Sequence, residues 1–518
     1  MAAKSRTEYS ARNTTVAMIS RISAIIMGFA LRVVFTRTLS ESYVGLNGLF
    51  LEIISVLSLS EMGVGTAITF ALYKPIAEGN IEKQKSLMRM YCWFYRIVAL
   101  VVLGAGLCII PFLSILIKDY ASVDQVIVIY LLYLVNAVCS YLFIYKRTLM
   151  DAHQLQYIGT FYMTMSWVLQ DILQIGILIF TKNFVLFLLV NILTTIICNV
   201  CTTRRANKLY PYLADKQIEP LEAQERQSIF RNIKAMLMHK VGDVVVCSTD
   251  NMILSAFVGL TSVGCYSNYY LVIGSISQLL DQMFAGITAS VGNLGVTAER
   301  TRVRKVFEAS FFAGYWLYGL SAICLYELIN PFVELSFGRQ YLFAGEIVLI
   351  LCVNFYVKGM RRATLIFRDS LGLFWYDRYK AIVEAVLNLV ISIVLVQFMG
   401  TIGVFLGTLI STCLTSVWVE PYILYKHEMK SSVLPYFGKY ACYTFVLAIG
   451  WFATDWLCNQ ISGGLGTILI LRLAVCVIIP NLLFLLVYAR TGEFRFLWEK
   501  LKMLLQRKRG HESCKKKE

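Results

Sequence analysis

Long apolar runs separated by short polar breaks recur along the whole sequence. An apolar run of 18 or more residues is long enough to cross a bilayer as a helix. A helix also satisfies its own backbone hydrogen bonds in hydrocarbon. The pattern therefore predicts an all-α, polytopic membrane protein with about 14 transmembrane helices. The predicted spans are 13–37, 43–72, 90–117, 123–145, 157–180, 183–201, 234–258, 263–295, 307–330, 342–366, 379–398, 400–424, 437–457 and 465–488.

The charge of the polar breaks alternates, and this alternation orients the helices. About 39 of the 48 Lys and Arg residues fall in the N-terminus, the connections after even-numbered spans and the C-terminal tail. The opposite connections carry only Arg37, Lys118, Lys182 and Arg339. Cytoplasmic connections of membrane proteins are enriched in Lys and Arg. Both termini are therefore predicted to be cytoplasmic, in a multi-pass plasma-membrane protein.

Composition narrows the class of protein further. Hydrophobic residues make up 58% of the chain and charged residues 15%, with a mean hydropathy of +0.65, which excludes an ordinary soluble domain. The net charge of +16 lies in short connections and the tail, where it faces anionic inner-leaflet lipids. No basic domain outside the membrane points to nucleic acid. The four histidines and 14 cysteines show no ligand spacing, so no metal site and no cofactor is predicted.

The sequence contains an internal repeat with an offset of about 219–220 residues. Six predicted helices per repeat unit is an even number, so both units enter the membrane in the same direction. Parallel repeats of this kind form two lobes around an axis along the membrane normal, with a cavity between them. The features that coincide are Arg21 with Lys240, Val44-Gly45 with Val263-Gly264, Pro111-Phe112 with Pro331-Phe332, and Val185-Leu186 with Phe405-Leu406.

The repeat and the polar breaks together predict how the chain is divided into domains. Two six-helix lobes are followed by two extra C-terminal helices. All aqueous connections are short, and the longest joins the lobes on the cytoplasmic side. They leave no room for a soluble catalytic domain. The predicted parts are a cytoplasmic N-terminus (1–12), an N-lobe (13–201), a linker (202–233), a C-lobe (234–424), the extra helices (437–488) and a basic cytoplasmic tail (489–518).

Arg21 and Arg32 lie on the first predicted span, eleven residues apart. Eleven residues are about three helical turns, so both side chains share one face. The next span returns antiparallel, which places Arg21 near the level of Glu61 and Arg32 near the level of Glu52. These two acids point to opposite sides of their helix, so at most one addresses the arginines directly. Span 234–258 carries a stripe of three charged residues, Lys240, Asp243 and Asp250.

A charged side chain at membrane depth costs roughly 2.5–3.5 kcal/mol, so it usually faces protein or water. Arg21 and Lys240 occupy repeat-equivalent positions, and we expect them to face one another across the cavity. Together with Arg32 they are predicted to bind a diphosphate, which suits a guanidinium fork and an ammonium point charge. A structural ion pair is the alternative at each position. Scattered acids that fit this alternative are Asp171, Asp281, Glu308 and Glu384.

The acids near the predicted cavity have two open interpretations. They balance the basic groups at rest, or they carry a coupling proton or sodium ion. The sequence does not choose between the two. The residues concerned are Glu52, Glu61, Asp243 and Asp250.

One stretch resembles a known family. Residues 36–79 read TRTLSESYVGLNGLFLEIISVLSLSEMGVGTAITFALYKPIAEG. They are similar to the N-terminal signature of bacterial polysaccharide and oligosaccharide-unit flippases (Wzx-like sugar translocases) of the multidrug/oligosaccharidyl-lipid/polysaccharide exporter superfamily. In layout, the likeness extends over residues 13–488. Related peptidoglycan-precursor flippases use basic cavity residues on the first helices of their lobes, which agrees with Arg21, Arg32 and Lys240.

The resemblance implies a flippase of the bacterial cytoplasmic membrane for undecaprenyl-diphosphate-linked oligosaccharide units. It would move each unit from the cytoplasmic to the outer leaflet by alternating access, for the synthesis of cell-surface polysaccharide or exopolysaccharide. Polysaccharide polymerases and glycosyltransferases are candidate partners. The resemblance implies a membrane transporter and no enzyme.

Two other functions remain open at this point. A drug or cation exporter of the same superfamily would favour an acidic cavity and usually stops at twelve helices. The number of cavity acids keeps this alternative in place. A membrane polysaccharide polymerase or ligase would need a substantial outer loop, whereas the outer connections predicted here are only a few residues long.

Overall fold

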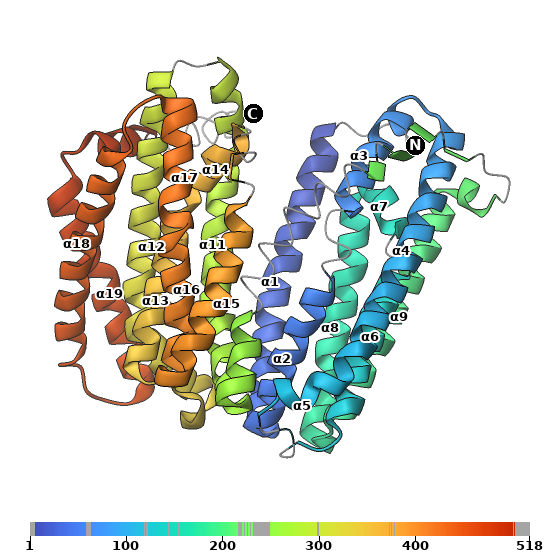
Figure 1. The fold of residues 1–518 in the computed structure, drawn as a ribbon, viewed down its shortest axis with the longest axis horizontal. Coiled ribbons are helices and arrows are strands. Elements are labelled where there is room, and N and C mark those ends of the chain that lie inside the picture. Colours follow the sequence, from blue (N-terminus) through green and yellow to red (C-terminus); the bar gives the residue numbers. More distant parts are fainter. Residues whose placement is uncertain are drawn as a thin grey trace, which may run out of the picture. The chain divides into compact units, whose positions relative to one another are not determined.

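In the part of the chain that the structure describes, all regular structure is helical (Figure 1). Nine described helices are long and apolar enough to cross a membrane. A tenth span results if the bent pair Val126–Tyr141 and Tyr145–Ala152 is counted as one. The predicted all-α, polytopic fold class is confirmed. The computed structural model describes all residues except 1–5, 59–63, 119, 121–122, 143–144, 154, 216–219, 222, 225, 228, 231–248, 298–299, 372, 374–375, 378, 501 and 503–518.

The chain forms two compact units, Met1–Ser267 and Asn268–Glu518, which we call unit 1 and unit 2. In unit 1, α1 packs along α8 and α8 packs along α9. The helices of unit 1 are α1 (Arg6–Thr38), α2 (Glu41–Leu57), α3 (Val64–Ala77), α4 (Ile81–Ile109), η2 (Ile110–Phe112), α5 (Leu113–Leu116), α6 (Val126–Tyr141), α7 (Tyr145–Ala152), α8 (Gln156–Thr181), α9 (Phe184–Leu209), η4 (Pro211–Ala214) and the π-helical turn η5 (Leu254–Val258).

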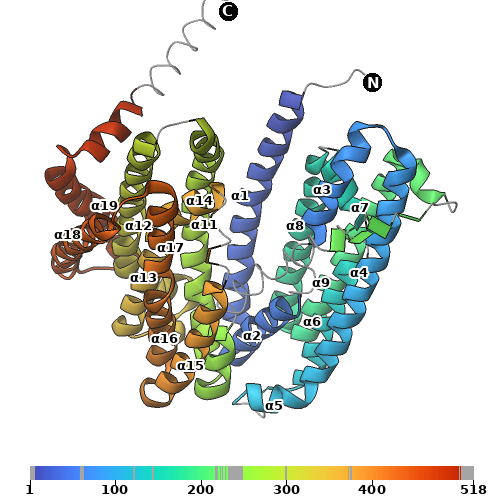
Figure 2. The same ribbon diagram turned by 45° about the horizontal axis from the view of Figure 1, so that its top comes forward.

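In unit 2, the last two helices of the chain pack on α12. Both views place α19 beside α12 (Figures 1 and 2). Tyr315 of α12 stacks on Tyr443 of α18, with ring centroids 4.5 Å apart. The helices are α11 (Leu260–Thr297, which begins in unit 1), α12 (Arg300–Phe337), η6 (Arg339–Tyr341), α13 (Gly345–Met360), α14 (Arg362–Ser370), α15 (Lys380–Met399), α16 (Thr401–Leu414), α17 (Ser416–Leu424), η8 (Tyr425–Met429), α18 (Leu434–Cys458) and α19 (Leu465–Tyr488).

Every predicted span that falls on described residues has a helical counterpart. Several helices extend beyond the apolar run, because polar turns outside hydrocarbon can continue a helix with water as a neighbour. α4 begins at Ile81, where the prediction had 90, and the Asn80 side chain caps it by accepting a hydrogen bond from the Lys83 N–H at 2.9 Å. Of span 234–258, only 249–258 lies within the described residues.

Two predicted spans are each divided between two α-helices that meet at one described residue. The pair α16 and α17 is separated at Thr415, whose hydroxyl donates to the Ser411 carbonyl oxygen at 2.6 Å. Such bonds from a side chain to the preceding turn often bend helices. These spans are 342–366, divided at Arg361 between α13 and α14, and 400–424, divided at Thr415 between α16 and α17.

The order of helices reproduces the internal repeat. α4 and α12 begin at Ile81 and Arg300, an offset of 219 residues, and α6 and α13 begin with the same offset. α6 and α13 are each followed by a short helix, α7 and α14. The predicted linker 202–233 and the C-lobe start at 234 stay predictions, because all of 231–248 lies outside the described residues.

Two glycines that the repeat makes equivalent, Gly45 and Gly264, lie against each other inside unit 1. A Cβ atom on Gly264 would lie 3.2 Å from the backbone nitrogen of Gly45. A Cβ atom on Gly45 would collide with the carbonyl oxygen of Leu260. The start of α2 and the start of α11 therefore approach as closely as they do only because both positions lack a side chain.

The variant Gly45→Ala is expected to lower the free energy of unfolding by about 1–3 kcal/mol, the usual cost of overpacking a filled interior. The Leu260 carbonyl is backbone and cannot rotate away from the added methyl group. Thermal unfolding of the purified protein in detergent measures the loss. Gly28→Ala in α1 is the matched control, since no atom lies within 4 Å of its Cβ position. Equal melting temperatures for Gly45→Ala and wild type would contradict the close approach.

Candidate functional site

The two predicted arginines lie on α1, which runs without a break from Arg6 to Thr38. Arg21 is exposed and Arg32 is partly buried. Because α1 is continuous between them, their eleven-residue separation places both on one side of the helix. The Arg32 guanidinium also lies over the ring of Phe35, 6.0 Å from its centroid. Unit 1 thus presents two permanent positive charges along one helix at membrane depth.

Polar groups from α2 and α6 gather near Arg32. The Tyr133 hydroxyl of α6 donates a hydrogen bond to the side-chain oxygen of Asn47 in α2. Tyr133 also lies within the field of the Arg32 guanidinium. Glu52 is partly buried and follows Asn47 along α2. The Arg32 end of α1 therefore faces a polar patch rather than a uniformly apolar helix surface.

The predicted partners of these arginines are only partly described. Glu61, Lys240 and Asp243 lie outside the residues that the structure describes. Asp250 is described and is buried, with 5% of its surface exposed, on the helical turn before η5. The approach of Arg21 to Lys240 and the roles of Glu52, Glu61, Asp243 and Asp250 therefore stay predictions.

α1 is held in place by polar contacts as well as by packing. The Thr164 hydroxyl of α8 donates to the Ser20 hydroxyl at 2.6 Å, next to Arg21. The Gln174 side chain of α8 donates to the Phe187 carbonyl oxygen of α9 at 3.0 Å. Hydrogen bonds between helices stabilise helix association in membranes, where association gains little from the hydrophobic effect. The Thr164–Ser20 bond joins α1 to α8 directly beside Arg21, and the Gln174–Phe187 bond joins α8 to α9.

Two of the scattered acids are engaged in ion pairs within unit 2. Asp281 pairs with Arg362 at 3.0 Å and accepts a hydrogen bond from Tyr318 at 2.9 Å. Glu308 pairs with Arg304 at 2.9 Å and with Lys439 at 2.9 Å. These contacts support the ion-pair interpretation for Asp281 and Glu308.

Glu384 is a third such acid and lies in the interior of unit 2. It accepts a hydrogen bond from Thr412 at 2.9 Å and lies 3.8 Å from Arg361. Asp171 differs from these three acids. It is partly buried on α8, and no ion pair joins it to another described residue.

Sequence reasoning missed a buried charge cluster centred on Glu420 in α17. The carboxylate is fully buried and accepts two hydrogen bonds from Arg361, at 2.7 and 3.1 Å. Lys380 donates to the same carboxylate, and Arg368 lies 3.9 Å away. Arg368 also pairs with the buried Asp377. The cluster joins α14, α15 and α17. Its opposite charges neutralise one another, so its role is to stabilise the packing of these helices.

One signal in the sequence could have found this cluster. Glu420 is an acid inside the apolar run 400–424, as Glu384 is inside 379–398. Arg361 and Lys380 lie at the edges of their predicted spans and were counted as cytoplasmic connection charges. Their pairing across 59 and 40 residues is tertiary and has no local signature.

No protein-family model matches the chain, and no curated protein matches its sequence. Its fold, in contrast, matches solved structures of membrane transporters. The structure titled "Lipid II flippase MurJ, inward closed conformation" superposes with a TM-score of 0.65 at 14% identity, over 92% of this chain and 98% of that chain. An inward-facing multidrug resistance MATE family transporter of the MOP superfamily gives a TM-score of 0.61 at 13% identity, over 79% and 97%.

A third match is a point mutant of the Vibrio cholerae MATE transporter VcmN, with a TM-score of 0.53 at 15% identity over 83% of this chain and 99% of that chain. Identities this low establish the fold alone. The class of the protein follows from it: the chain has the polytopic helical fold that MurJ shares with the MATE transporters.

Proposed function

We propose that this chain is a flippase that moves undecaprenyl-diphosphate-linked oligosaccharide units from the cytoplasmic to the outer leaflet by alternating access. The observation that carries the proposal is the pair Arg21 and Arg32 on one side of α1, in a fold similar to a lipid II flippase. A transporter of an anionic head group needs fixed positive charge inside the membrane. The lipid tail of the substrate, in contrast, needs only the hydrocarbon of the bilayer.

The chemistry of the head group matches the side chains. A guanidinium binds a phosphate through two parallel hydrogen bonds, and it stays charged at every physiological pH. Charged side chains at membrane depth commonly mark the pathway of a substrate, so the position of Arg21 and Arg32 suits contact with a diphosphate. We place Lys240 as the third basic group, contributed by the second repeat unit.

A multidrug or cation exporter is the second candidate, because MATE transporters share the fold. Two observations disfavour it. The two MATE matches cover 79% and 83% of this chain, against 92% for the flippase. Furthermore, Asp281, Glu308 and Glu384 already lie beside arginines or a lysine of the protein itself, so these acids are not available for a cationic drug.

Leaflet translocation in proteoliposomes tests the proposal. The probe is an undecaprenyl-diphosphate oligosaccharide with a label that an external reagent can reach from one side only. We expect the protein to accelerate transfer of this lipid at least about tenfold over empty liposomes, and to leave a neutral glycolipid with the same sugars at the background rate. Efflux of a cationic dye without transfer of the diphosphate lipid, under imposed proton or sodium gradients, would establish the exporter instead.

A further inference from the structure

Glu327 is a buried acid inside a membrane-spanning helix of unit 2. It belongs to α12, and its side chain is 2% exposed. Helices α18 and α19 pack on α12 (Figure 1). Each of them brings one charged side chain to this acid, Asp455 from α18 and Arg472 from α19. We call Glu327, Asp455 and Arg472 the α12–α18–α19 cluster.

Arg472 satisfies the Glu327 carboxylate only in part. Its Nη1 atom donates a hydrogen bond to the backbone oxygen of Glu327 at 3.3 Å and lies 3.8 Å from the carboxylate oxygen Oε2. The other carboxylate oxygen, Oε1, is buried and accepts no hydrogen bond from any described group. An ionised carboxylate without hydrogen bonds is costly inside a protein, because burial removes the water that would solvate its charge.

A second carboxyl group lies within hydrogen-bonding reach of the first. Asp455 is partly exposed in the last turns of α18 and accepts a hydrogen bond from the Asn459 side chain at 3.0 Å. Its carboxyl group also contacts that of Glu327. Two ionised carboxylates in contact repel one another, and such a pair holds one proton instead. The proton then belongs to the pair rather than to either residue.

The helices around Glu327 supply no cation besides Arg472 to balance the second acid. Every residue of α12, α13, α18 and α19 is described. The other titratable groups that face Glu327 from these helices are a phenol and thiols, which are neutral at neutral pH. They are Cys324 and Tyr326 of α12, Cys352 of α13, Cys458 of α18 and Cys476 of α19. Arg472 therefore balances one carboxylate, and the other requires a bound cation.

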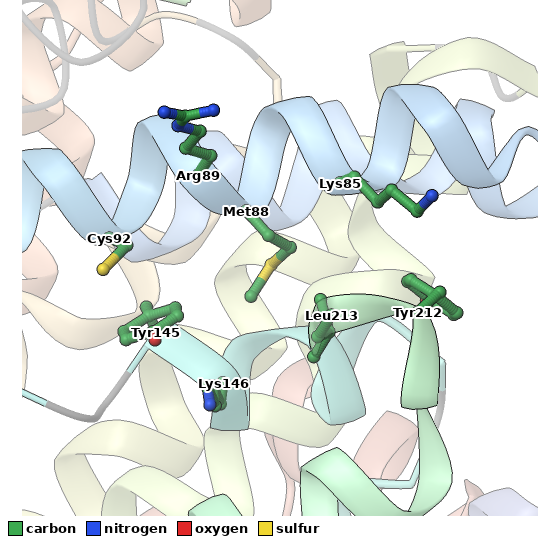
Figure 3. Close-up of a pocket in the computed structure, with 8 residues that line it drawn as sticks. All are labelled: Lys85, Met88, Arg89, Cys92, Tyr145, Lys146, Tyr212 and Leu213. Carbon is green, nitrogen blue, oxygen red and sulfur yellow. The ribbon is translucent and has the colours of Figure 1, made fainter. Parts of the chain in front are cut away.

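Unit 1 contains one cation beside two acids in a different environment. Lys85 of α4 donates to Asp215 at 2.7 Å and to Glu82 at 2.8 Å. Figure 3 shows Lys85 and Tyr212 among the residues that line a pocket between α4 and η4. The side chains of Asp215 and Glu82 are 48% and 55% exposed, so water solvates both carboxylates. The buried acid of α12 has no such access to water.

We propose that Glu327 and Asp455 bind one proton between them at neutral pH, with Arg472 as the counter-charge of the remaining carboxylate. Glu327 and Asp455 lie close to the predicted outer ends of the spans 307–330 and 437–457, so the proton comes from the outer aqueous phase. The proposal does not rest on the flippase function, because it concerns a bound proton and not the transported substrate. Sodium is the other cation that carboxylates bind.

Infrared spectroscopy of the purified full chain tests the proposal. A protonated carboxyl group has a C=O stretching band that is separate from the bands of carboxylates and of the backbone. At about pH 7.5 carboxyl groups in water are ionised, and a maltoside detergent has no carbonyl group of its own. We expect Glu327→Gln and Asp455→Asn each to lose the band area of one protonated carboxyl group, because either change leaves a single carboxylate beside Arg472.

The double variant distinguishes a shared proton from two separate ones. Glu327→Gln with Asp455→Asn should lose no more band area than either single variant, because the pair holds one proton. Glu334→Gln is the matched control, since Glu334 is also an acid of α12 but pairs with the exposed Arg339. This control should leave the band unchanged. Asp455 is partly exposed, so Asp455→Asn decides the matter even if Glu327→Gln fails to fold.

Three results would overturn the proposal. The first is the absence of the protonated carboxyl band in wild type, which needs no substitution. The second is an unchanged band in Asp455→Asn, or a loss in the double variant equal to the area of two carboxyl groups. The third comes from spectra recorded with sodium chloride in place of choline chloride at constant pH. Loss of the band in sodium would mean that sodium, and not a proton, occupies the acid pair.

Discussion

Replacement of Glu420 by glutamine is expected to lower the free energy of unfolding by about 3–5 kcal/mol, the usual cost of removing one partner from a buried charge pair. Glutamine keeps the shape of the side chain but removes the charge that Arg361 and Lys380 share. Both cations would remain inside unit 2 without their main anion. The variant should unfold at a lower temperature than wild type in the same detergent, as followed by far-ultraviolet circular dichroism.

The control for this prediction is Glu334→Gln in α12. Glu334 also pairs with an arginine, Arg339, but that arginine is exposed to solvent. Exposed ion pairs contribute about 0–1 kcal/mol, so the control should shift the melting temperature little. Equal shifts in the two variants would mean that the Glu420 cluster does not lock the helices together.

A second substitution isolates the charge from the shape. In the double variant Lys380→Met with Glu420→Gln, one cation and the anion are removed together, which leaves Arg361 with the nearby Glu384. We expect part of the stability lost in Glu420→Gln to return, because fewer uncompensated charges stay buried. The coupling energy from the complete double-mutant cycle measures that return.

The positions and order of the apolar helices within the described residues could be predicted from the sequence, because each depends on one local property. An apolar run must be helical in hydrocarbon, and its length is set by bilayer thickness. The same property says little about where a helix ends in water, so α4 begins at Ile81, several residues before the apolar run. The breaks at Arg361 and Thr415 were also not predicted.

These breaks depend on neighbouring helices. Gly359, two residues before the break at Arg361, lies where an added Cβ atom would collide with the ring of Tyr318 in α12. Nothing within the run 342–366 encodes that contact. The same limit applies to charge: Arg361 and Lys380 are ordinary loop cations by sequence, and only the fold brings them to Glu420.

The candidate site also has one part that local sequence predicts and one part that depends on helix packing. Helical spacing suffices to place Arg21 and Arg32 on one side of α1. The polar patch of Asn47 and Tyr133 near Arg32 required the packing of α2 on α6.

Replacement of either α1 arginine by alanine is expected to slow translocation of the diphosphate lipid by about 10- to 100-fold, since a hydrogen bond to a charged group contributes about 1.5–3 kcal/mol. Lysine at the same position keeps the charge but loses the two-pronged contact with phosphate, so Arg21→Lys and Arg32→Lys should transport at intermediate rates. A purely structural role would give no such ranking between alanine and lysine at constant melting temperature. Lys240→Ala should fall in the same range if the second repeat unit contributes to the same site.

Arg96→Ala is the matched control, because Arg96 is a further arginine within a membrane-spanning helix, exposed on α4. Arg96 lies near the predicted cytoplasmic end of the apolar span 90–117, where a long side chain carries its charge to the interface and has no need of a substrate. Its variant should therefore transport at close to the wild-type rate. If Arg96→Ala loses as much activity as Arg21→Ala and Arg32→Ala, the arginines act through general membrane charge. If all three variants transport normally, the diphosphate is recognised elsewhere, and the α1 arginines stabilise the packing of α1 against its neighbours.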